Sequence, residues 1–468
     1  MKNMTTGNPL KLILLFMFPI LLGNIFHQFY ILSDLYILGH YLGIRALAIA
    51  GAMTPVFIMA IMTSLGFTNG LSIITAQRFG ANDIKNVRKS FAIGIVLSSI
   101  FALFVFSVLI FKMDLILQLM NVPQDIFVDA GRFMTILSYG VIAIVFYNFL
   151  AGILRSLGDS KTPLYYLIFS SVLNVVINIA FIVQFHLDVT GVAFGTCIAQ
   201  FTSAVLCLAY MLIKYPMLRI KKSDFSFDLK YVIEHLKIAI PMTVQFSIIG
   251  LGVITVQSVC NQFGTDTIAA FSAATRIEQL ATMPLFSLGN AITTYVAQNF
   301  GARLLRRIRQ GILQCFILSS GASIILAILS FVWGKNLAAL FLNNPSEEIL
   351  SQSTMYLQIT TIFYIFLAQI FIFRQALQGM GRAVIPLISG IIELIMRWFA
   401  AFTLASYFGY KGICYAGPIA WTSAAIFVFI SYIVLIKRFN VPLFGPLDQK
   451  FPIKKDLQIN YPSKNNRN

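Results

Sequence analysis

Long apolar stretches separated by short polar connections dominate this chain. The stretches 90–111 and 312–333, for example, contain no charged residue. About 20 apolar residues in a helix suffice to cross roughly 30 Å of hydrocarbon. The pattern therefore predicts an all-α integral membrane protein with twelve transmembrane helices. Their predicted ranges are 10–38, 46–76, 90–111, 130–154, 164–185, 191–213, 238–262, 268–297, 311–333, 353–376, 387–407 and 412–436.

The chain contains the same sequence twice. The run Ala-Gln-Arg-Phe-Gly-Ala at 76–81 returns as Ala-Gln-Asn-Phe-Gly-Ala at 297–302. At nearly the same spacing, the first half matches the second at several further pairs: Gly43 and Gly264, Asn69 and Asn290, Leu154 and Leu377, Pro163 and Pro386. Six helices per repeat is an even number, so both halves enter the membrane the same way round and are parallel repeats. We expect two six-helix lobes around a central cavity, an architecture typical of transporters.

The domain boundaries follow from the polar connections. The N-terminal lobe is predicted at 1–213 and the C-terminal lobe at 237–436. The longest polar connection, 214–236, is the predicted cytoplasmic linker between them, and 437–468 is a polar cytoplasmic tail whose end is expected to be disordered.

Composition and charge agree with a membrane protein. The chain is 58% hydrophobic and 11% charged, whereas soluble domains carry about 25% charged residues. With the N-terminus inside, most Lys and Arg lie on the inner side, and few basic residues remain outside: Arg45, Lys112, Arg132, Lys335 and Lys411. This asymmetry predicts a multi-pass protein of the plasma membrane with both termini cytoplasmic. The net charge of +17 is then explained by the basic residues of the cytoplasmic segments. We expect the lipid bilayer, not nucleic acid, as partner.

The sequence offers no basis for an enzyme. It contains no metal-ligand spacing, glycine-rich phosphate loop or nucleophile elbow, so we expect no catalytic residue, no metal and no cofactor. The cysteines all fall inside or at the edge of predicted helices, where they are typical small buried residues: Cys197, Cys207, Cys260, Cys315 and Cys414.

Polar residues at membrane depth are the functional candidates, because they are costly there. Asp34 lies about 36 Å along the first helix at 1.5 Å per residue, toward the outer side. The N-terminal lobe offers it no clear salt-bridge partner. Burial favours the neutral form of such a carboxyl group, which could take up a proton on one side and release it on the other. A hydrogen-bonded helix cap is the alternative interpretation.

Depth also places other polar residues near Asp34. Asn174 and Asn178 are four residues apart and share one helical face, and Thr196 enters from the outer side on the next helix. Asn148 is a weaker member of this predicted cation-coupling set. Hydrogen bonds that merely hold helices together are the alternative for the two asparagines.

Two more residues of the first helix are candidates. His27 lies two turns before Asp34 on the same face and could relay protons, although a packing role is also open. Pro19 interrupts the backbone hydrogen bonds and should bend the helix. Pro241 holds the equivalent place in the second repeat, so the bend could simply be inherited.

The C-terminal lobe carries its own charges. Glu278 lies near mid-membrane and could attract a cationic substrate. Glu393 and Arg397 are four apart and are predicted to form an ion pair on one face. Arg276 points away from Glu278, and Arg374 lies near the inner end of its helix.

Several of these motifs together resemble the multidrug and toxic compound extrusion (MATE) family. They are the Asp-Leu-Tyr-Ile-Leu-Gly-His run at 34–40 followed by Gly43, the duplicated Gln-x-Phe-Gly-Ala motif, Glu-Leu-Ile-Met-Arg at 393–397, and Gln-Gly-Met-Gly at 378–381 before Pro386. The resemblance covers about 10–436. It implies an exporter that exchanges an inward-flowing cation for an outward-flowing drug-like compound.

The resemblance also bears on the coupling ion. In members with an acidic first-helix site, the matching positions surround that acid, and some members carry a second carboxylate where this chain has Asn178. The sodium-coupled branch has acids on helices seven and ten, where this chain has Gln257 and Gln369 and neither Asp nor Glu. These departures favour H⁺ over Na⁺, with Na⁺ still possible.

The substrate is only weakly indicated. The chain contains 43 Phe, 18 Tyr and 16 Met, which suit loose binding of flat cations. A flippase or exporter of a lipid-linked precursor or metabolite is the alternative function. It would be expected to need a basic cavity, yet the predicted intramembrane bases are only Arg276, Arg374 and Arg397. We expect a monomer.

Overall fold

The computed structural model describes residues 3–225, 229–341, 345–439 and 446–451, which form helices and connections without any strand. The helices of the first half are α1 (Pro9–Ile37), α2 (Gly43–Gly80), α3 (Ile84–Phe111), α4 (Met113–Leu119), α5 (Phe127–Ser156), α6 (Lys161–Val183) and α7 (Val189–Lys214). Those of the second half are α8 (Leu229–Cys260), α9 (Thr265–Gly301), α10 (Leu305–Ala339), α11 (Glu347–Ile362), α12 (Tyr364–Gly379), α13 (Val384–Phe399), α14 (Ala405–Phe408), α15 (Tyr410–Cys414) and α16 (Ala416–Arg438).

The twelve predicted transmembrane segments all fall on helices, with differences in detail. The tenth is two helices, α11 and α12, bent by 49° at their junction. The eleventh runs from α13 through a π-helical turn (Ala400–Leu404) into α14. The short helix α4 in the connection after α3 was not predicted, because it is too short to cross a membrane.

One predicted span, now α9, is less apolar than the others. By length and composition, nine helical stretches among the described residues could cross a membrane, or ten with the bent pair, and α9 is not among them. It packs against α1, α2, α10, α11 and α12. A helix covered by protein on so many sides faces little lipid, so it tolerates polar residues that a lipid-facing helix would not.

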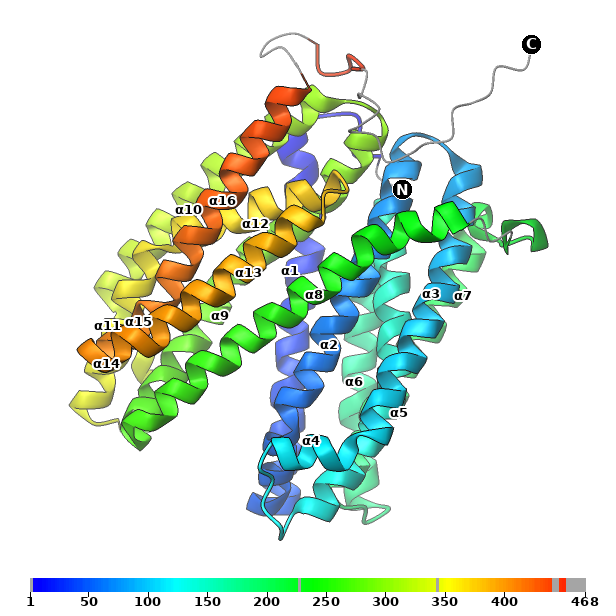
Figure 1. Ribbon diagram of the computed structural model, residues 1–468. Coiled ribbons are helices and arrows are strands. Elements are labelled where there is room, and N and C mark those ends of the chain that lie inside the picture. Colours follow the sequence, from blue (N-terminus) through cyan, green and yellow to red (C-terminus); the bar gives the residue numbers. More distant parts are fainter. Residues whose placement is uncertain (1–2, 226–228, 342–344, 440–445, 452–468) are drawn as a thin grey trace, which may run out of the picture.

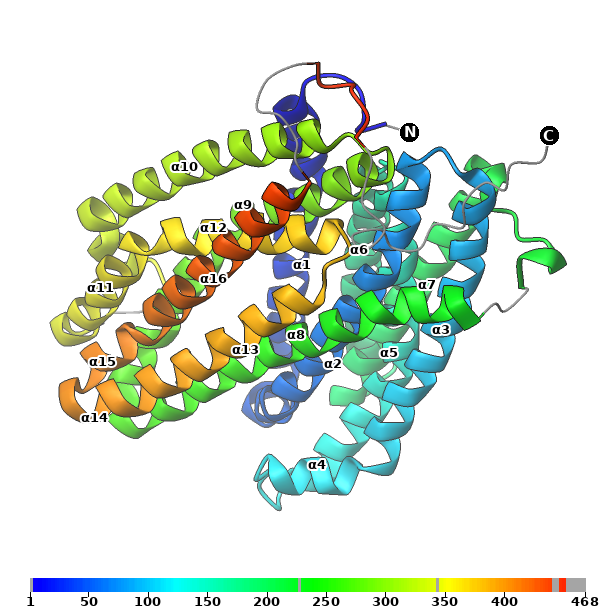
Figure 2. The ribbon, with the colours of Figure 1, turned by 45° about the horizontal axis from the view of Figure 1, so that its top comes forward.

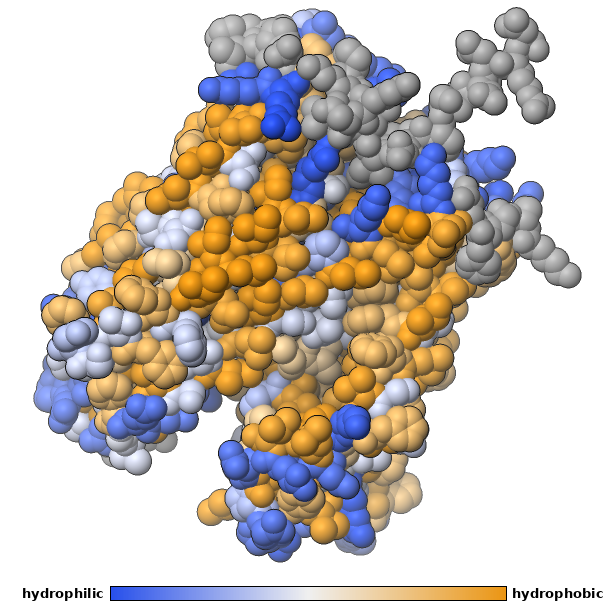
Figure 3. All heavy atoms as spheres, in the orientation of Figure 1, coloured by the Kyte–Doolittle hydropathy of each residue, from blue (hydrophilic) through white to orange (hydrophobic). Residues whose placement is uncertain are grey.

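The helices form two lobes, α1–α7 and α8–α16, which confirms the predicted architecture (Figure 1). The lobes converge at the end of the molecule that carries the N-terminus and diverge at the opposite end, where α4 and α14 lie (Figures 1 and 2). The space-filling view shows an open notch between the lobes at that diverging end (Figure 3). Helix α2 packs against α8 and α9, and α1 against α6 and α9, so these helices join the lobes.

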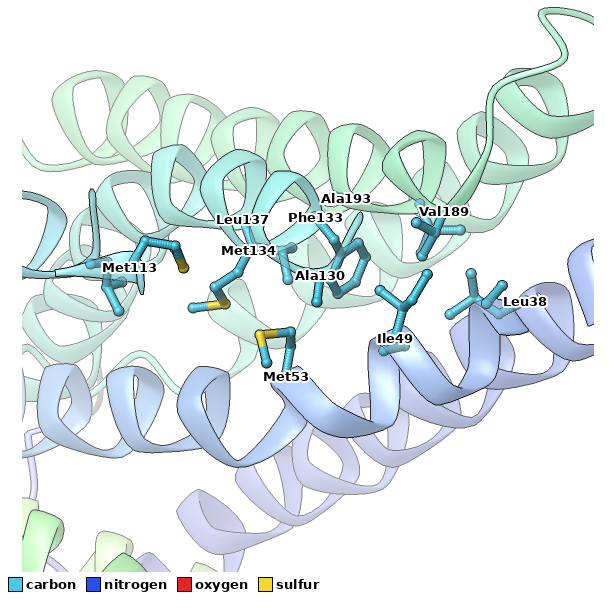
Figure 4. Packing of buried hydrophobic residues seen from close by; sticks show 14 of the residues in the cluster. Leu38, Ile49, Met53, Met113, Ala130, Phe133, Met134, Leu137, Val189 and Ala193 are labelled. Carbon is cyan, nitrogen blue, oxygen red and sulfur yellow. The ribbon is translucent and has the colours of Figure 1, made fainter. Parts of the chain in front are cut away.

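Apolar side chains fill each lobe and also cover its outside. In the N-terminal lobe, Ile49 and Met53 of α2 face Phe133 and Met134 of α5, with Val189 of α7 beside them (Figure 4). The outer surface shows a broad hydrophobic band with polar residues concentrated toward its ends (Figure 3). Such a band is typical of a surface in contact with lipid, where exposed apolar side chains meet hydrocarbon.

The two copies of the duplicated motif lie against each other at the converging end. A side chain on Gly80 would collide with the backbone carbonyl of Gln298, and one on Gly301 would collide with the carbonyl of Gln77. Glycine at these two positions therefore allows α2 and α9 to approach more closely than any other residue would permit.

The motif glutamines reinforce this contact symmetrically. Gln77 Nε2 donates to the carbonyl oxygen of Gly379 in the opposite lobe at 2.8 Å, and Gln298 Nε2 donates to that of Ser156 at 2.8 Å. Each copy of the motif thus supplies one glutamine hydrogen bond from its own lobe to the other. The two copies of the duplicated motif are therefore related by a pseudo-twofold axis, and their glycine contacts and glutamine hydrogen bonds hold the lobes together at this end; we call this contact the lock.

The connection predicted as a linker is held against the N-terminal lobe. Arg88 of α3 pairs with Asp224 at 2.6 Å, and Arg78 of α2 pairs with Glu234 at 2.6 Å. Burial alone would raise the pKa of Asp224, but hydrogen bonds from Arg88 and from the backbone N–H of Lys221 outweigh it and lower that pKa. The Arg88–Asp224 pair is therefore ionised at neutral pH.

Part of the predicted tail packs on the C-terminal lobe. The backbone N–H of Phe451 donates to the carbonyl oxygen of Arg303 at 3.1 Å, and the guanidinium of Arg306 lies over the Phe451 ring. The end of the tail, for which disorder was predicted, lies outside the described residues.

Candidate functional site

The predicted polar cluster around Asp34 is present. Asn178 Nδ2 donates to Asp34 Oδ1 at 2.7 Å and to Asn174 Oδ1 at 3.2 Å. Asn174 Nδ2 lies 3.5 Å from the Thr196 hydroxyl. Asn174 and Asn178 are fully buried and Thr196 nearly so. Helices α1, α6 and α7 therefore bring these four residues together, as their depths in the sequence predicted.

Local structure places Asp34 close to the end of α1. The helix continues into a π-helical turn (Leu38–Leu42), and Gly43 then begins α2 with a backbone φ of +78°. A residue with a Cβ is strained at such a φ, which explains the glycine of this motif. The carboxylate is thereby held against α6 in the diverging half of the N-terminal lobe.

The partners of Asp34 are neutral. Within the part of the chain that the structure describes, no Lys, Arg or His forms an ion pair with it. The carboxyl group is partly buried, and a buried carboxylate without a counter-charge is costly. This environment allows the group to change between charged and neutral forms, whereas a salt bridge would hold it in the charged form.

The Asn174 amide is a further neutral neighbour of the carboxyl group. One of its two terminal atoms lies 2.8 Å from Asp34 Oδ1. Two neutral amides, those of Asn174 and Asn178, therefore lie within hydrogen-bonding distance of Asp34.

Tyr30 and Gln200 belong to this cluster but were not predicted from the sequence. Tyr30 is buried one turn before Asp34 on α1, and its hydroxyl lies beside Thr196 and Gln200 of α7. His27 stacks on the Tyr30 ring, with ring centroids 6.1 Å apart. The four-residue spacing of Tyr30 and Asp34 on one helical face is the signal that could have identified Tyr30.

The remaining candidates of the N-terminal lobe lie apart from Asp34. Asn148 on α5 forms no side-chain hydrogen bond with the described residues, so the structure does not join it to the cluster. Pro19 is buried, and α1 runs through it as one helix. Five residues further along α1, Asn24 Nδ2 donates to the Ser287 hydroxyl of α9 at 2.9 Å. Helix α1 thus contacts the opposite lobe as well as its own.

The C-terminal lobe contains a buried charge cluster. Glu393 accepts from Arg374 at 2.8 Å and from Arg397 at 2.9 Å, so the predicted Glu393–Arg397 pair is present and Arg374 joins it. Arg374 also donates to the Ser389 hydroxyl at 3.0 Å. Two cations share one carboxylate here, and the cluster carries an excess positive charge.

Glu278 lies near this cluster without forming an ion pair in it. The Tyr356 hydroxyl donates to Glu278 Oε2 at 2.9 Å. Arg276 is exposed on another face of α9, as the spacing predicted. Glu278 is therefore a second intramembrane carboxyl group held by a neutral partner.

Two parallel helical repeats that are splayed at one end and in contact at the other, with a carboxyl group inside each lobe, are typical of a membrane transporter. The comparisons with known proteins agree. The MatE family model matches residues 19–180 and 241–403, and the chain belongs to this family. It is a multi-pass membrane transporter and not an enzyme.

Relatives resemble it along most of its length. The probable multidrug resistance protein YpnP of Bacillus subtilis is 27% identical over 416 residues, which cover 88% of this chain and 92% of that protein. The probable multidrug resistance protein NorM of Thermotoga maritima is 25% identical, with 83% and 84% covered. The solved outward-facing structure of a MATE multidrug resistance transporter has a TM-score of 0.86 at 23% identity, with 94% and 98% covered. That last likeness concerns the fold.

Proposed function

We propose that this protein exports drug-like organic compounds, cations among them, in exchange for protons that enter through Asp34. The single observation that carries the proposal is a lone carboxylate held by neutral partners on α1, the helix that contacts both lobes. The names of the relatives support the drug-like substrate class.

The proposed cycle follows from the change of charge at Asp34. A proton arriving from the open side neutralises Asp34, and the hydrogen bond that the Asn178 amide of α6 donates to the carboxylate is weakened. The charge that had to be stabilised by α6 is then gone, so α1 is free to shift against α9. That shift would open the locked end, where the proton is released and substrate enters.

The orientation of the molecule is part of the proposal. Basic residues gather near the locked end, among them Arg78, Arg88, Arg306 and Arg307, and such residues favour the cytoplasmic side. We therefore place the locked end and both termini in the cytoplasm and the open notch outside. The protein would act in the plasma membrane, and we expect a monomer.

The polar cluster favours H⁺ over Na⁺ as the coupling ion. A sodium ion requires several oxygen ligands around a well-charged site. Here one carboxylate faces the amide nitrogen of Asn178, and Asn178 Oδ1 packs against Gly195. A proton needs only the carboxyl group itself and one acceptor.

Ethidium transport in proteoliposomes tests the proposal. The wild type should move ethidium under an imposed pH gradient and not under a sodium gradient alone. Asp34→Asn should abolish gradient-driven transport, because the amide takes up no proton, while the folded protein remains abundant. A fully active Asp34→Asn protein would remove Asp34 from the coupling role. Wild-type transport driven by sodium alone would replace H⁺ by Na⁺.

A further inference from the structure

A small polar cavity lies between the lobes, apart from both carboxyl sites. It has a volume of about 40 Å³ and is lined from α2, α5, α8, α9 and α12. Its polar lining includes Asn69, Asn290, Thr293 and Arg155. Asn69 precedes Gln77 on α2, and Asn290 precedes Gln298 on α9. The cavity therefore lies on the side of these glutamines that faces the notch. It therefore forms the floor of the space between the lobes.

Arg155 is the charged residue of this floor. Its Nη2 lies 3.4 Å from the Asn69 side-chain oxygen, a long contact. No carboxylate among the described residues forms an ion pair with it. A guanidinium has five N–H donors, so most of the hydrogen-bonding capacity of Arg155 is unused. Among the described residues that line the cavity none is acidic, and the floor therefore carries a positive charge.

The duplication shows that this charge is not required by the fold. Leu154 matches Leu377, so Arg155 matches Gln378 in the second repeat. Gln378 is fully buried and donates to Gln245 at 2.8 Å. A neutral amide therefore fills the equivalent structural place. An unpaired cation is costly to keep in such a site, and a ligand that meets it would offset that cost.

We propose that Arg155 binds the carboxylate of zwitterionic or anionic substrates at the floor of the space between the lobes. The inference rests on the proposed export function and names the residue that would recognise a carboxylate among its drug-like substrates. A guanidinium and a carboxylate form paired, charge-assisted hydrogen bonds. A cavity of about 40 Å³ accepts the two oxygen atoms of such a group but no whole drug molecule, so the remainder of the substrate would lie in the notch above.

Two dyes that differ in one group test this assignment. Rhodamine 110 carries a free carboxylate, and rhodamine 123 is its methyl ester with the same ring system. Transport of both is measured in proteoliposomes for the wild type, Arg155→Gln, Arg155→Lys and Arg276→Gln. Arg155→Gln introduces the residue type that the second repeat has at the matching position, Gln378. The last removes an equal charge from an exposed position outside the cavity.

The expected result is a change in selectivity. Arg155→Gln should raise the KM for rhodamine 110 roughly tenfold, the loss of one charge-assisted contact, and leave that for rhodamine 123 within about twofold. Arg155→Lys should recover part of the rhodamine 110 transport, and Arg276→Gln should change neither dye. Equal effects of Arg155→Gln on both dyes, or none on either, would overturn the proposal.

A free halide is the other possible source of negative charge. If Arg155 held chloride, replacing chloride by gluconate would impair wild-type transport of rhodamine 123, and Arg155→Gln would remove that dependence. This outcome would overturn the carboxylate assignment. If the wild type transports neither dye, the proposed export function fails instead. Equilibrium binding of both dyes in detergent, followed by fluorescence anisotropy, would then still measure whether Arg155 selects the carboxylate.

Discussion

At the scale of single residues, this transporter separates carboxyl groups by the partners that surround them. Asp34 and Glu278 accept hydrogen bonds from uncharged side chains, whereas Glu393 lies between two arginines. A carboxyl group with neutral partners can gain or lose a proton without breaking an ion pair. One between two cations remains charged and contributes to structure. Chemically identical groups therefore have different expected roles.

Asn178→Asp should shift coupling from H⁺ toward Na⁺. The substitution places a second carboxylate beside Asp34 in almost the same volume, and two carboxylates supply the charge and oxygen ligands that a sodium ion needs. Transport driven by separate pH and sodium gradients in proteoliposomes measures the shift. Ion dependence identical to that of the wild type would show that the number of carboxylates does not select the ion.

Glu393→Gln should destabilise the protein more than Glu278→Gln does. The first change leaves Arg374 and Arg397 buried without their shared counter-charge, a loss of about 3–5 kcal/mol for a broken buried pair. The second removes one acceptor from a tyrosine, about 1 kcal/mol. Thermal unfolding of the detergent-solubilised variants compares them. If Glu393→Gln unfolds like the wild type but does not transport, the cluster belongs to the transport machinery.

At the scale of the helices, α2 and α9 lock one end of the molecule because both copies of the motif place glycine at the crossing. Gly80 and Gly301 let the backbones meet, and Gln77 and Gln298 bridge the lobes. In the proposed cycle, this contact between α2 and α9 separates when the locked end opens.

Gly80→Ala should weaken the lock, and Gly51→Ala should not. Both positions lie inside α2, but a Cβ at Gly80 meets the Gln298 backbone, while one at Gly51 meets nothing within 4 Å. Alanine at Gly51 should even stabilise the helix by up to about 1 kcal/mol. Hydrogen exchange of the start of α10 measures opening of the locked end. Equal protection in both variants would contradict a role of the glycine contact in closure.

At the scale of the whole molecule, α1 is placed to connect the proposed coupling site at Asp34 with the proposed motion of the lobes. It carries Asp34 against α6 and hydrogen-bonds α9 through Asn24 and Ser287. In the proposed cycle, the notch at the diverging end (Figure 3) is the space that closes when the lobes rock. Neutralising Asp34 is therefore expected to change the distance between the two outer ends.

Spin labels at Asp114 on α4 and Tyr407 on α14, both exposed, should report that motion. With the native cysteines replaced, Asp34→Asn should shift the distance distribution toward shorter values, because the neutral side chain mimics the protonated state. The wild type should shift the same way on acidification. Distances that are unchanged in both cases would separate protonation of Asp34 from lobe movement.

Much of this architecture was determined by the sequence alone. Apolar length specifies helices because lipid leaves backbone groups no other partner, and the duplicated motif specifies two parallel lobes. Depth along each helix was sufficient to bring Asn174, Asn178 and Thr196 to Asp34. The Glu393–Arg397 pair followed from helical spacing.

Other features depended on contacts between distant segments. Only the tertiary structure showed that Arg374 joins Glu393 and that the motif glutamines cross between lobes. It also showed that Arg155 faces a cavity whose described lining contains no acidic residue. The break between α11 and α12 was equally invisible, since both halves are apolar. Hydropathy and periodicity describe one helix at a time, whereas the partner of a polar side chain is decided by which helix packs beside it.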